Sequence, residues 1–79
     1  MSDLEKYKEV FVETFSVGVS DLSQDFAYQS IDAWDSIGHM SLITALENAF
    51  DILIEMDDVI DFASFEKGKE ILRKYELDL

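Results

Sequence analysis

Apolar residues recur at helical spacing near the start of the chain, which predicts a first helix. Four large apolar side chains follow one another three or four positions apart, at Leu4, Tyr7, Phe11 and Phe15. This period places them on one face of a helix. Ser2 followed by Glu5 matches a capping box at the helix start, and Gly18 fits the helix end. We therefore expect a helix from about Asp3 to Ser16.

A second helical pattern runs from about Ser36 to Phe50. On a helical wheel of about 100° per residue, an apolar cluster marks the core face: Leu42, Leu46, Ala49 and Phe50. His39 and Ile43 flank this face. The nearly opposite side carries four residues, Ile37, Met40, Thr44 and Glu47. We expect Ile37 and Met40 to be exposed beside Ser36, unless the preceding loop covers them.

Two shorter elements follow the second helix. Residues 51–56 are expected to form a short extended link, and residues 57–62 suit one or two helical turns. Ser64 is placed to cap a final helix that runs through Tyr75. Gly68 lies on the apolar face of that helix and permits a close helix contact, at a cost in helix propensity.

The stretch 19–35 shows no sustained period and is expected to be a long loop. Apolar side chains are scattered along it, and they should pin the loop to the core. Loops of this length are usually functional or disordered, and this one is too apolar for disorder. The chain as a whole predicts an all-α fold. We expect residues 1–79 to form one domain, a four-helix bundle with a long first loop and a short third helix.

Charge is distributed unevenly along this acidic chain. The formal net charge is −12, and residues 35–62 contain acidic residues but no basic one. Such a field repels nucleic acid and anionic lipid and attracts basic protein surfaces. Solubility is an equally good explanation of the net charge alone, but its concentration in one segment favours a docking role. We expect no nucleic-acid partner.

Composition also limits the available chemistry. The chain contains no cysteine, which excludes disulfides and thiolate metal sites. A calcium loop beginning at Asp51 is excluded, because Leu53 and Phe62 occupy ligand positions and a central glycine is missing. We find no metal site. No apolar run is long enough to cross a bilayer, and the N-terminus lacks signal-peptide features, so we expect a cytoplasmic protein without membrane insertion. We also expect a monomer.

The candidate chemistry lies in Trp34-Asp35-Ser36-Ile37, at the start of the second helix. Either Asp35 or Ser36 can be the N-cap, and a serine at a helix start is most often only a cap. The same position suits a covalently attached phosphate, because free N–H groups and the positive end of the helix dipole favour an anion. Trp34 is expected to be a packing anchor.

These residues resemble those of the acyl carrier protein family. The resemblance rests on Asp35-Ser36-Ile37, Leu42, Ala45-Leu46-Glu47, Phe50-Asp51-Ile52 and Ile54. The order of helix, long loop, serine-bearing helix, short helix and final helix also matches, over essentially the whole chain. The tripeptide alone is a weak signal, whereas its combination with length, acidity and the residues that follow is specific.

The resemblance implies a non-catalytic carrier protein. Ser36 would be esterified with 4′-phosphopantetheine from coenzyme A by a phosphopantetheinyl transferase. The thiol of this arm would hold an acyl group as a thioester and present it to partner enzymes. It also implies that acyl-loading and acyl-using enzymes with basic docking surfaces bind the helix that begins at the serine. The corresponding recognition residues are Asp35, Ile37, Met40 and Glu47.

The chain departs from the family pattern at three places. Housekeeping fatty-acid carriers usually read Gly-Ala-Asp-Ser-Leu, whereas this chain has Trp34 before Asp35-Ser36-Ile37. Ser41 and Asn48 stand where acids are common, and Phe62 is bulky where a smaller residue is usual. These departures indicate a specialised carrier, as in polysaccharide modification or secondary metabolism. The family's acyl cavity would lie near Leu46, Ile54 and Phe62, so the bulk of Phe62 favours a short or polar cargo.

Three alternatives remain open from the sequence. An aminoacyl or peptidyl type of carrier would use the same serine, but the Gly-Gly-His/Asp-Ser style of that type is absent. A small hydrolase would use Ser36 with His39, which are neighbours three positions apart on a helix. An acidic interaction adaptor or nucleic-acid mimic would need no prosthetic group and would depend on acids such as Asp57, Asp58 and Asp61.

Overall fold

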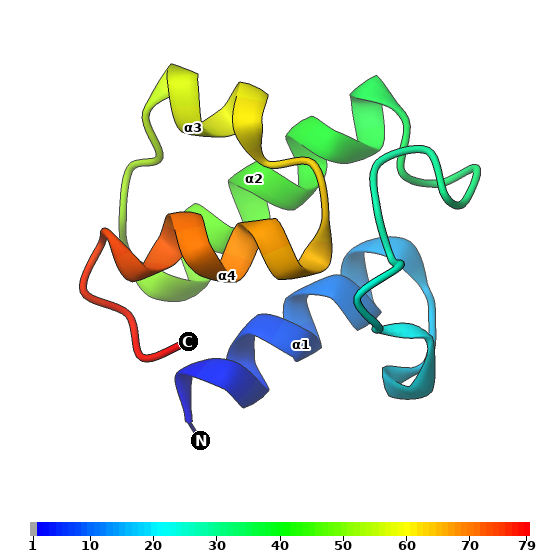
Figure 1. Cartoon of the computed structure of the whole chain (residues 1–79), viewed down its shortest axis with the longest axis horizontal. Helices are drawn as coiled ribbons and strands as arrows, with labels where there is room; N and C mark the ends of the chain where they lie inside the picture. The colour runs from blue at the N-terminus through cyan, green and yellow to red at the C-terminus, as the bar shows by residue number, and fades with distance from the viewer. Residues whose placement is uncertain (1) are drawn as a thin grey trace.

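Four α-helices form the fold in the computed structural model, which describes residues 2–79 (Figure 1). Their bounds are Asp3–Phe15 (α1), Ser36–Phe50 (α2), Met56–Asp61 (α3) and Phe65–Arg73 (α4). One turn of 3-10 helix, Val19–Asp21, lies in the long segment between α1 and α2. Within residues 2–79 the pairing of extended backbone is limited to one isolated bridge. The expected all-α fold with a short third helix is therefore confirmed.

The first helix begins as expected but ends earlier. The Ser2 hydroxyl accepts a hydrogen bond from the Glu5 N–H at 3.1 Å and so caps the helix. Phe15 is the last residue of α1 and is buried in the core. The chain turns directly after it through Ser16, whose φ is 55°. The expectation that Gly18 ends the helix is therefore wrong, because the left-handed position falls on Ser16.

Aromatic rings fill the core between the helices. Phe11, which is fully buried, packs against rings from four segments of the chain: Tyr7, Phe15, Phe26, Trp34, Phe62 and Phe65. The buried Tyr7 hydroxyl donates to the Phe65 carbonyl at 2.7 Å, which satisfies a polar group that would otherwise cost free energy. Burial of Tyr7 raises the pKa of its hydroxyl well above the ordinary range. The core thus joins α1 to α4 and to the long loop.

The loop between α1 and α2 is pinned to the start of α4. The Tyr28 N–H donates to the Ala63 carbonyl at 2.9 Å, and the Phe65 N–H donates to the Phe26 carbonyl at 2.8 Å. Phe26 and Trp34 are buried, as expected for anchors of this loop. The loop therefore covers one side of the aromatic core and leaves the outer face of α2 open.

Helices α3 and α4 close the remaining side of the bundle. The Ser64 hydroxyl accepts from the Lys67 N–H at 2.9 Å, which confirms the expected cap of α4. The helix ends at Arg73 rather than Tyr75, because the next residues turn back. A side chain at Gly68 would overlap the Phe62 ring and the Tyr7 hydroxyl, so the expected close contact is confirmed. No helix among residues 2–79 has the length and apolar character needed to cross a membrane.

Candidate functional site at the start of α2

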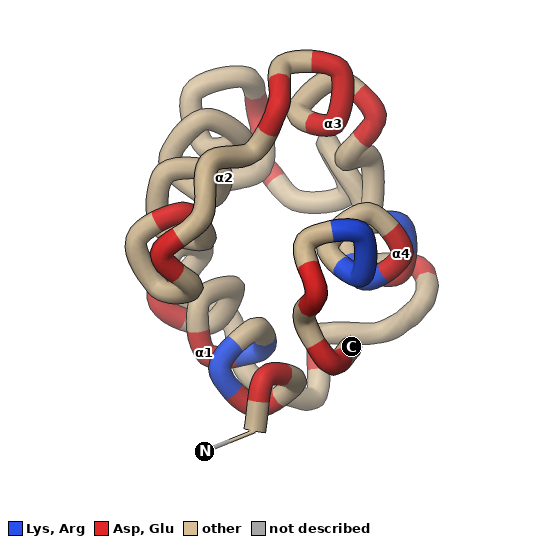
Figure 2. The backbone as a smooth tube through the Cα atoms, turned by 90° about the vertical axis from the view of Figure 1, so that its left-hand side faces the viewer, with Lys and Arg blue, Asp and Glu red and all other residues tan. Residues whose placement is uncertain are grey.

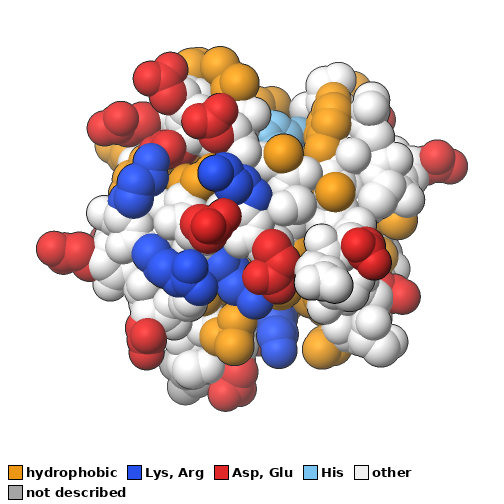
Figure 3. Space-filling model, viewed as in Figure 1, with side chains coloured by type: hydrophobic (Ala, Val, Ile, Leu, Met, Phe, Trp, Pro, Cys, Tyr) orange, Lys and Arg blue, Asp and Glu red, His pale blue; other side chains and the backbone are white. Residues whose placement is uncertain are grey.

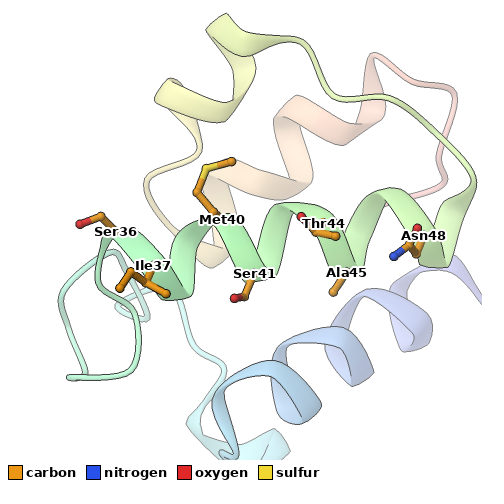
Figure 4. A pocket seen from close by; sticks show the side chains of 7 residues that line it. All are labelled: Ser36, Ile37, Met40, Ser41, Thr44, Ala45 and Asn48. Carbon is orange, nitrogen blue, oxygen red and sulfur yellow. The ribbon is translucent and has the colours of Figure 1, made fainter.

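Ser36 is the first residue of α2, and its hydroxyl has no structural task. The N-cap is Asp35, whose carboxylate accepts a hydrogen bond from the Gly38 N–H at 2.8 Å. Ser36 is exposed, and within residues 2–79 its hydroxyl makes no hydrogen bond. Figure 4 shows this hydroxyl directed away from the helix bundle. The sequence left the cap undecided between two residues, and the structure assigns it to Asp35.

The segment before Ser36 is held tightly against α2. Trp34 is fully buried and stacks on Phe15 with a centroid distance of 5.2 Å, so the expected packing anchor is confirmed. The carbonyl of Ala33 approaches Gly38 so closely that any side chain at position 38 would overlap it. Sequence reasoning missed this role of Gly38. The available signal was a glycine inside a helical pattern, which often marks a close backbone approach.

Two apolar side chains beside Ser36 face outward. Ile37 is 80% exposed and Met40 is 51% exposed, so the long loop does not cover them and the expected orientation is confirmed. They continue into a shallow groove along α2 that small and polar side chains complete: Ser36, Ser41, Thr44, Ala45 and Asn48 (Figure 4). An exposed apolar spot at the end of such a groove is typical of an interaction surface.

Ile43 and Glu47 lie closer to the core than the helical pattern predicts. Ile43 is 2% exposed and belongs to the core rather than to its flank. Glu47, expected on the outer side, is half-buried, and its carboxylate accepts a hydrogen bond from the Ile54 N–H at 2.9 Å. The segment after α2 folds back along the helix and reaches the Glu47 carboxylate. Glu47 therefore ties the α2–α3 link to α2, and its proposed role in partner recognition stays a prediction.

A second hollow opens between α2 and α3. It has a volume of about 340 Å³ and mostly apolar walls: Tyr28, Ser36, His39, Met40, Met56, Val59, Ile60, Phe62 and Ala63. Of the residues expected around an acyl cavity, Phe62 lines this hollow, whereas Leu46 and Ile54 do not. All three are buried, and the Phe62 ring packs on Phe11. The hollow next to Ser36 is thus bounded on its inner side by aromatic rings.

Both ring nitrogens of His39 are engaged away from Ser36. The indole N–H of Trp34 donates to His39 Nδ1 at 3.0 Å. His39 Nε2 lies 2.8 Å from the carbonyl oxygen of Val59. The serine–histidine hydrogen bond that a hydrolase needs is therefore not formed. His39 is half-buried, at the flank of the core face where the helical pattern places it.

Charge divides the molecule into two parts. All basic residues lie in α1 or in and directly after α4, as the tube in Figure 2 shows, whereas the stretch from Asp35 to Phe62 carries acids alone. Figure 3 shows the Lys and Arg side chains gathered on the face that carries α4. Within residues 2–79 no group of three or more acidic or histidine side chains is arranged to hold a metal ion. The acids of this stretch thus give it a negative charge without metal-ligand geometry among the described residues.

One acid of α3 is held by a lysine and a tyrosine that directly follow α4. Asp58 is 7% exposed and lies 2.5 Å from Lys74 Nζ and 2.6 Å from the Tyr75 hydroxyl. The hydrogen bond from Lys74, followed by that from Tyr75, lowers the pKa of Asp58. The same bond raises the pKa of Lys74, and burial raises that of Tyr75. This group fixes α3, which forms one wall of the hollow beside Ser36.

Comparisons of this chain with protein-family models, with curated proteins and with solved structures give no significant match.

Proposed function

We propose that this protein is an acyl carrier that bears 4′-phosphopantetheine on Ser36. The observation that carries the proposal is the separation of two roles at the start of α2. Asp35 caps the helix, and the neighbouring Ser36 hydroxyl is exposed and free to be modified. A serine that only caps a helix accepts a hydrogen bond from a backbone N–H with its hydroxyl, as Ser2 and Ser64 do.

The position also suits the phosphodiester that the proposal requires. The first N–H groups of a helix have no intrahelical partner, and the helix dipole places partial positive charge there, so a phosphate attached to Ser36 is stabilised. The arm would supply the thiol that this cysteine-free chain lacks. Its thiol would form the thioester, and the protein would position the cargo without catalysing its transfer.

The surface around Ser36 supports a carrier that docks to basic enzymes. Ile37 and Met40 supply apolar contact area, and Asp35 supplies charge beside the serine. An apolar centre with charged surroundings is the usual anatomy of a transient interface, and acids without bases speed encounter with a basic partner. We infer that a phosphopantetheinyl transferase and the acyl-loading and acyl-using enzymes approach this end of α2.

The proposal is tested by the intact mass of the purified protein after co-expression with a promiscuous phosphopantetheinyl transferase. The wild type should gain the mass of one phosphopantetheine, and Ser36→Ala should gain none. Ser41→Ala is the matched control, because Ser41 is also exposed on the same groove of α2 and should leave the modification intact. An unmodified wild-type protein would contradict the proposal.

The same samples separate the alternative functions. An aminoacyl or peptidyl carrier would also be modified at Ser36, and it would differ in the acid that a loading enzyme attaches. An acidic adaptor would leave Ser36 unmodified and would keep its activity in Ser36→Ala. A hydrolase would be labelled by an active-site serine probe in the absence of any transferase.

A further inference from the structure

Trp34 places a polar group inside the aromatic core, and that group needs a partner. The side chain is fully buried among Phe11, Phe15 and Phe26. Its indole N–H can only donate, and a buried donor without an acceptor costs free energy. The acceptor is His39 Nδ1 at 3.0 Å. The two rings are nearly coplanar, with an interplanar angle of 15°, as an in-plane hydrogen bond between them requires.

The other nitrogen of His39 reaches a different element. Its Nε2 lies 2.8 Å from the carbonyl oxygen of Val59 in α3. That carbonyl is among the last four of a six-residue helix, which have no partner within the helix. Because the indole only donates and the carbonyl only accepts, a neutral imidazole with its proton on Nε2 satisfies both contacts at once. His39 therefore acts as an acceptor toward Trp34 and as a donor toward α3.

Aromatic neighbours fix the orientation of this imidazole. Tyr28 and Phe62 pack against its ring edge-to-face, at centroid distances of 5.6 Å and 6.1 Å. His39 and Ser36 both line the hollow between α2 and α3. The imidazole thus lines this hollow, and its hydrogen bonds also link Trp34, just before α2, to Val59 of α3. On the far side of α3, the link to α4 is the group formed by Asp58, Lys74 and Tyr75.

We propose that His39 is a positioning residue, which couples the segment carrying Ser36 to α3 through the chain Trp34–His39–Val59. Trp34 stands two residues before Ser36, so the hydrogen bond that holds its indole also holds the approach to the modified serine. The bond to Val59 sets the distance between α2 and α3 beside that serine. The effect of this coupling on phosphopantetheine transfer rests on the proposed function, whereas the coupling itself does not.

The test compares two substitutions of His39 in the full chain. His39→Phe keeps a planar ring but removes both hydrogen bonds. His39→Gln offers one acceptor and one donor in place of the two ring nitrogens. Trp34 is the only tryptophan, so its indole N–H gives a single resonance in a ¹H–¹⁵N spectrum and reports directly on the bond. Hydrogen exchange of the α3 amides reports on the second bond, and exchange of the α1 amides shows whether the fold is intact.

We expect His39→Phe to speed exchange of the indole N–H and the α3 amides by about tenfold relative to the wild type, since one buried hydrogen bond is lost at each end. His39→Gln should stay within about threefold, with α1 unchanged in both variants. Equal protection in His39→Phe and the wild type would overturn the coupling. Equal loss of protection in His39→Phe and His39→Gln would also overturn the coupling. The donor and acceptor of glutamine would then protect these N–H groups no better than a phenyl ring. If His39→Phe does not fold, His39→Gln decides alone. Protection close to that of the wild type then supports the coupling, and loss of protection overturns it.

A second measurement addresses Ser36 itself. The kcat/KM of a phosphopantetheinyl transferase acting on apo protein should fall by about three- to tenfold in His39→Phe and recover in His39→Gln, because a loosened serine segment must be ordered before transfer. Unchanged kcat/KM in His39→Phe would overturn the proposed effect on transfer to Ser36. The coupling measured by hydrogen exchange would still stand. A wild-type protein that is never modified would sink the proposed function, and the exchange measurement would still test the coupling.

Discussion

Gly38 controls how closely the segment before Ser36 approaches α2. A side chain at this position would overlap the carbonyl oxygen of Ala33 and also crowd the Phe15 ring. Alanine is ordinarily the better helix former by about 1 kcal/mol, but the overlap has to be relieved by moving the backbone. Strain of this kind costs about 1–3 kcal/mol in a packed environment, so the steric effect should prevail.

We expect Gly38→Ala to lower the free energy of unfolding by about 1–2 kcal/mol, as measured by urea denaturation. Gly18→Ala is the control, because its new methyl group would meet only Asp21 and Ser20 side-chain atoms at 3.6 Å and 3.7 Å. The control should stay within about 1 kcal/mol of the wild type. Equal midpoints for the two variants would show that the loop moves aside without cost.

Residue-level prediction succeeded where a local pattern decides the outcome. The exposure of Ile37 and Met40 follows from helical periodicity, and the cap at Ser64 follows from residue type. The choice between Asp35 and Ser36 as N-cap could not be made, because both side chains are good caps. The role of His39 was not predictable, since its partners come from the loop and from α3 and depend on tertiary packing.

The short helix α3 is tied to the bundle by two side chains that directly follow α4. Asp58 receives hydrogen bonds from Lys74 and Tyr75, and the Tyr75 hydroxyl in turn accepts from the Glu55 N–H at 3.0 Å. A six-residue helix has little stability of its own, so these contacts determine whether it stays folded on the bundle. The attachment depends on pH, because the pKa of Asp58 is lowered by the bond from Lys74.

The direction of this pH dependence follows from the shifted pKa values of the ion pair Asp58–Lys74. A lowered carboxyl pKa contributes stability that is present above the ordinary value of about 3.9 and is lost as the pH falls through the folded-state pKa. The raised pKa of Lys74 contributes stability that is present below its ordinary value and is lost as the pH rises through the folded-state pKa. The attachment of α3 is therefore strongest across the neutral range.

We expect Asp58→Asn to be less stable than the wild type near pH 7, with the difference shrinking as the pH falls below about 4. Once Asp58 is protonated, it resembles asparagine, and the two proteins should unfold at the same urea concentration. Asp57→Asn is the control on the same helix, since Asp57 is exposed. A gap between Asp58→Asn and the wild type that persists unchanged into acid would contradict this account.

Element bounds were predicted best where a cap and a sustained period coincide. The bounds of α2, Ser36–Phe50, agree with the expectation from periodicity. The end of α1 was misplaced because the chain uses Ser16 in a left-handed conformation where glycine is the usual residue. No side chain caps Met56–Asp61, and the N–H of its N-cap Glu55 donates instead to the hydroxyl of Tyr75, which is distant in sequence. The position of α3 was accordingly predicted only to within a residue.

At the scale of the whole molecule, charge distinguishes the end that carries Ser36 from the opposite side. The segment from Asp35 to Phe62 is free of bases, whereas α1, α4 and the residues directly after α4 combine acids with all the basic residues. This asymmetry follows directly from the sequence once the helices are placed. Its consequence is directional, because a basic partner is attracted to α2 and α3 and meets mixed charge on the side of α4.

Two matched pairs of acids test this direction. Asp57 and Asp61 stand four residues apart on α3, and Glu66 and Glu70 have the same spacing on α4, with all four side chains exposed. Replacing either pair by lysine changes the net charge by the same amount. We expect Asp57→Lys with Asp61→Lys to lower the kcat/KM of phosphopantetheine transfer by about tenfold at low salt. Glu66→Lys with Glu70→Lys should lower it by less than about threefold.

Rising ionic strength should reduce the difference between these two variants, because exposed charges are screened beyond about 10 Å at 0.1 M salt. Measuring kcat/KM for both variants and the wild type across a salt series therefore separates local attraction from overall net charge. If the two variants lost activity equally at every salt concentration, net charge alone would explain encounter. The acids of α3 would then have no special part in bringing a partner to Ser36.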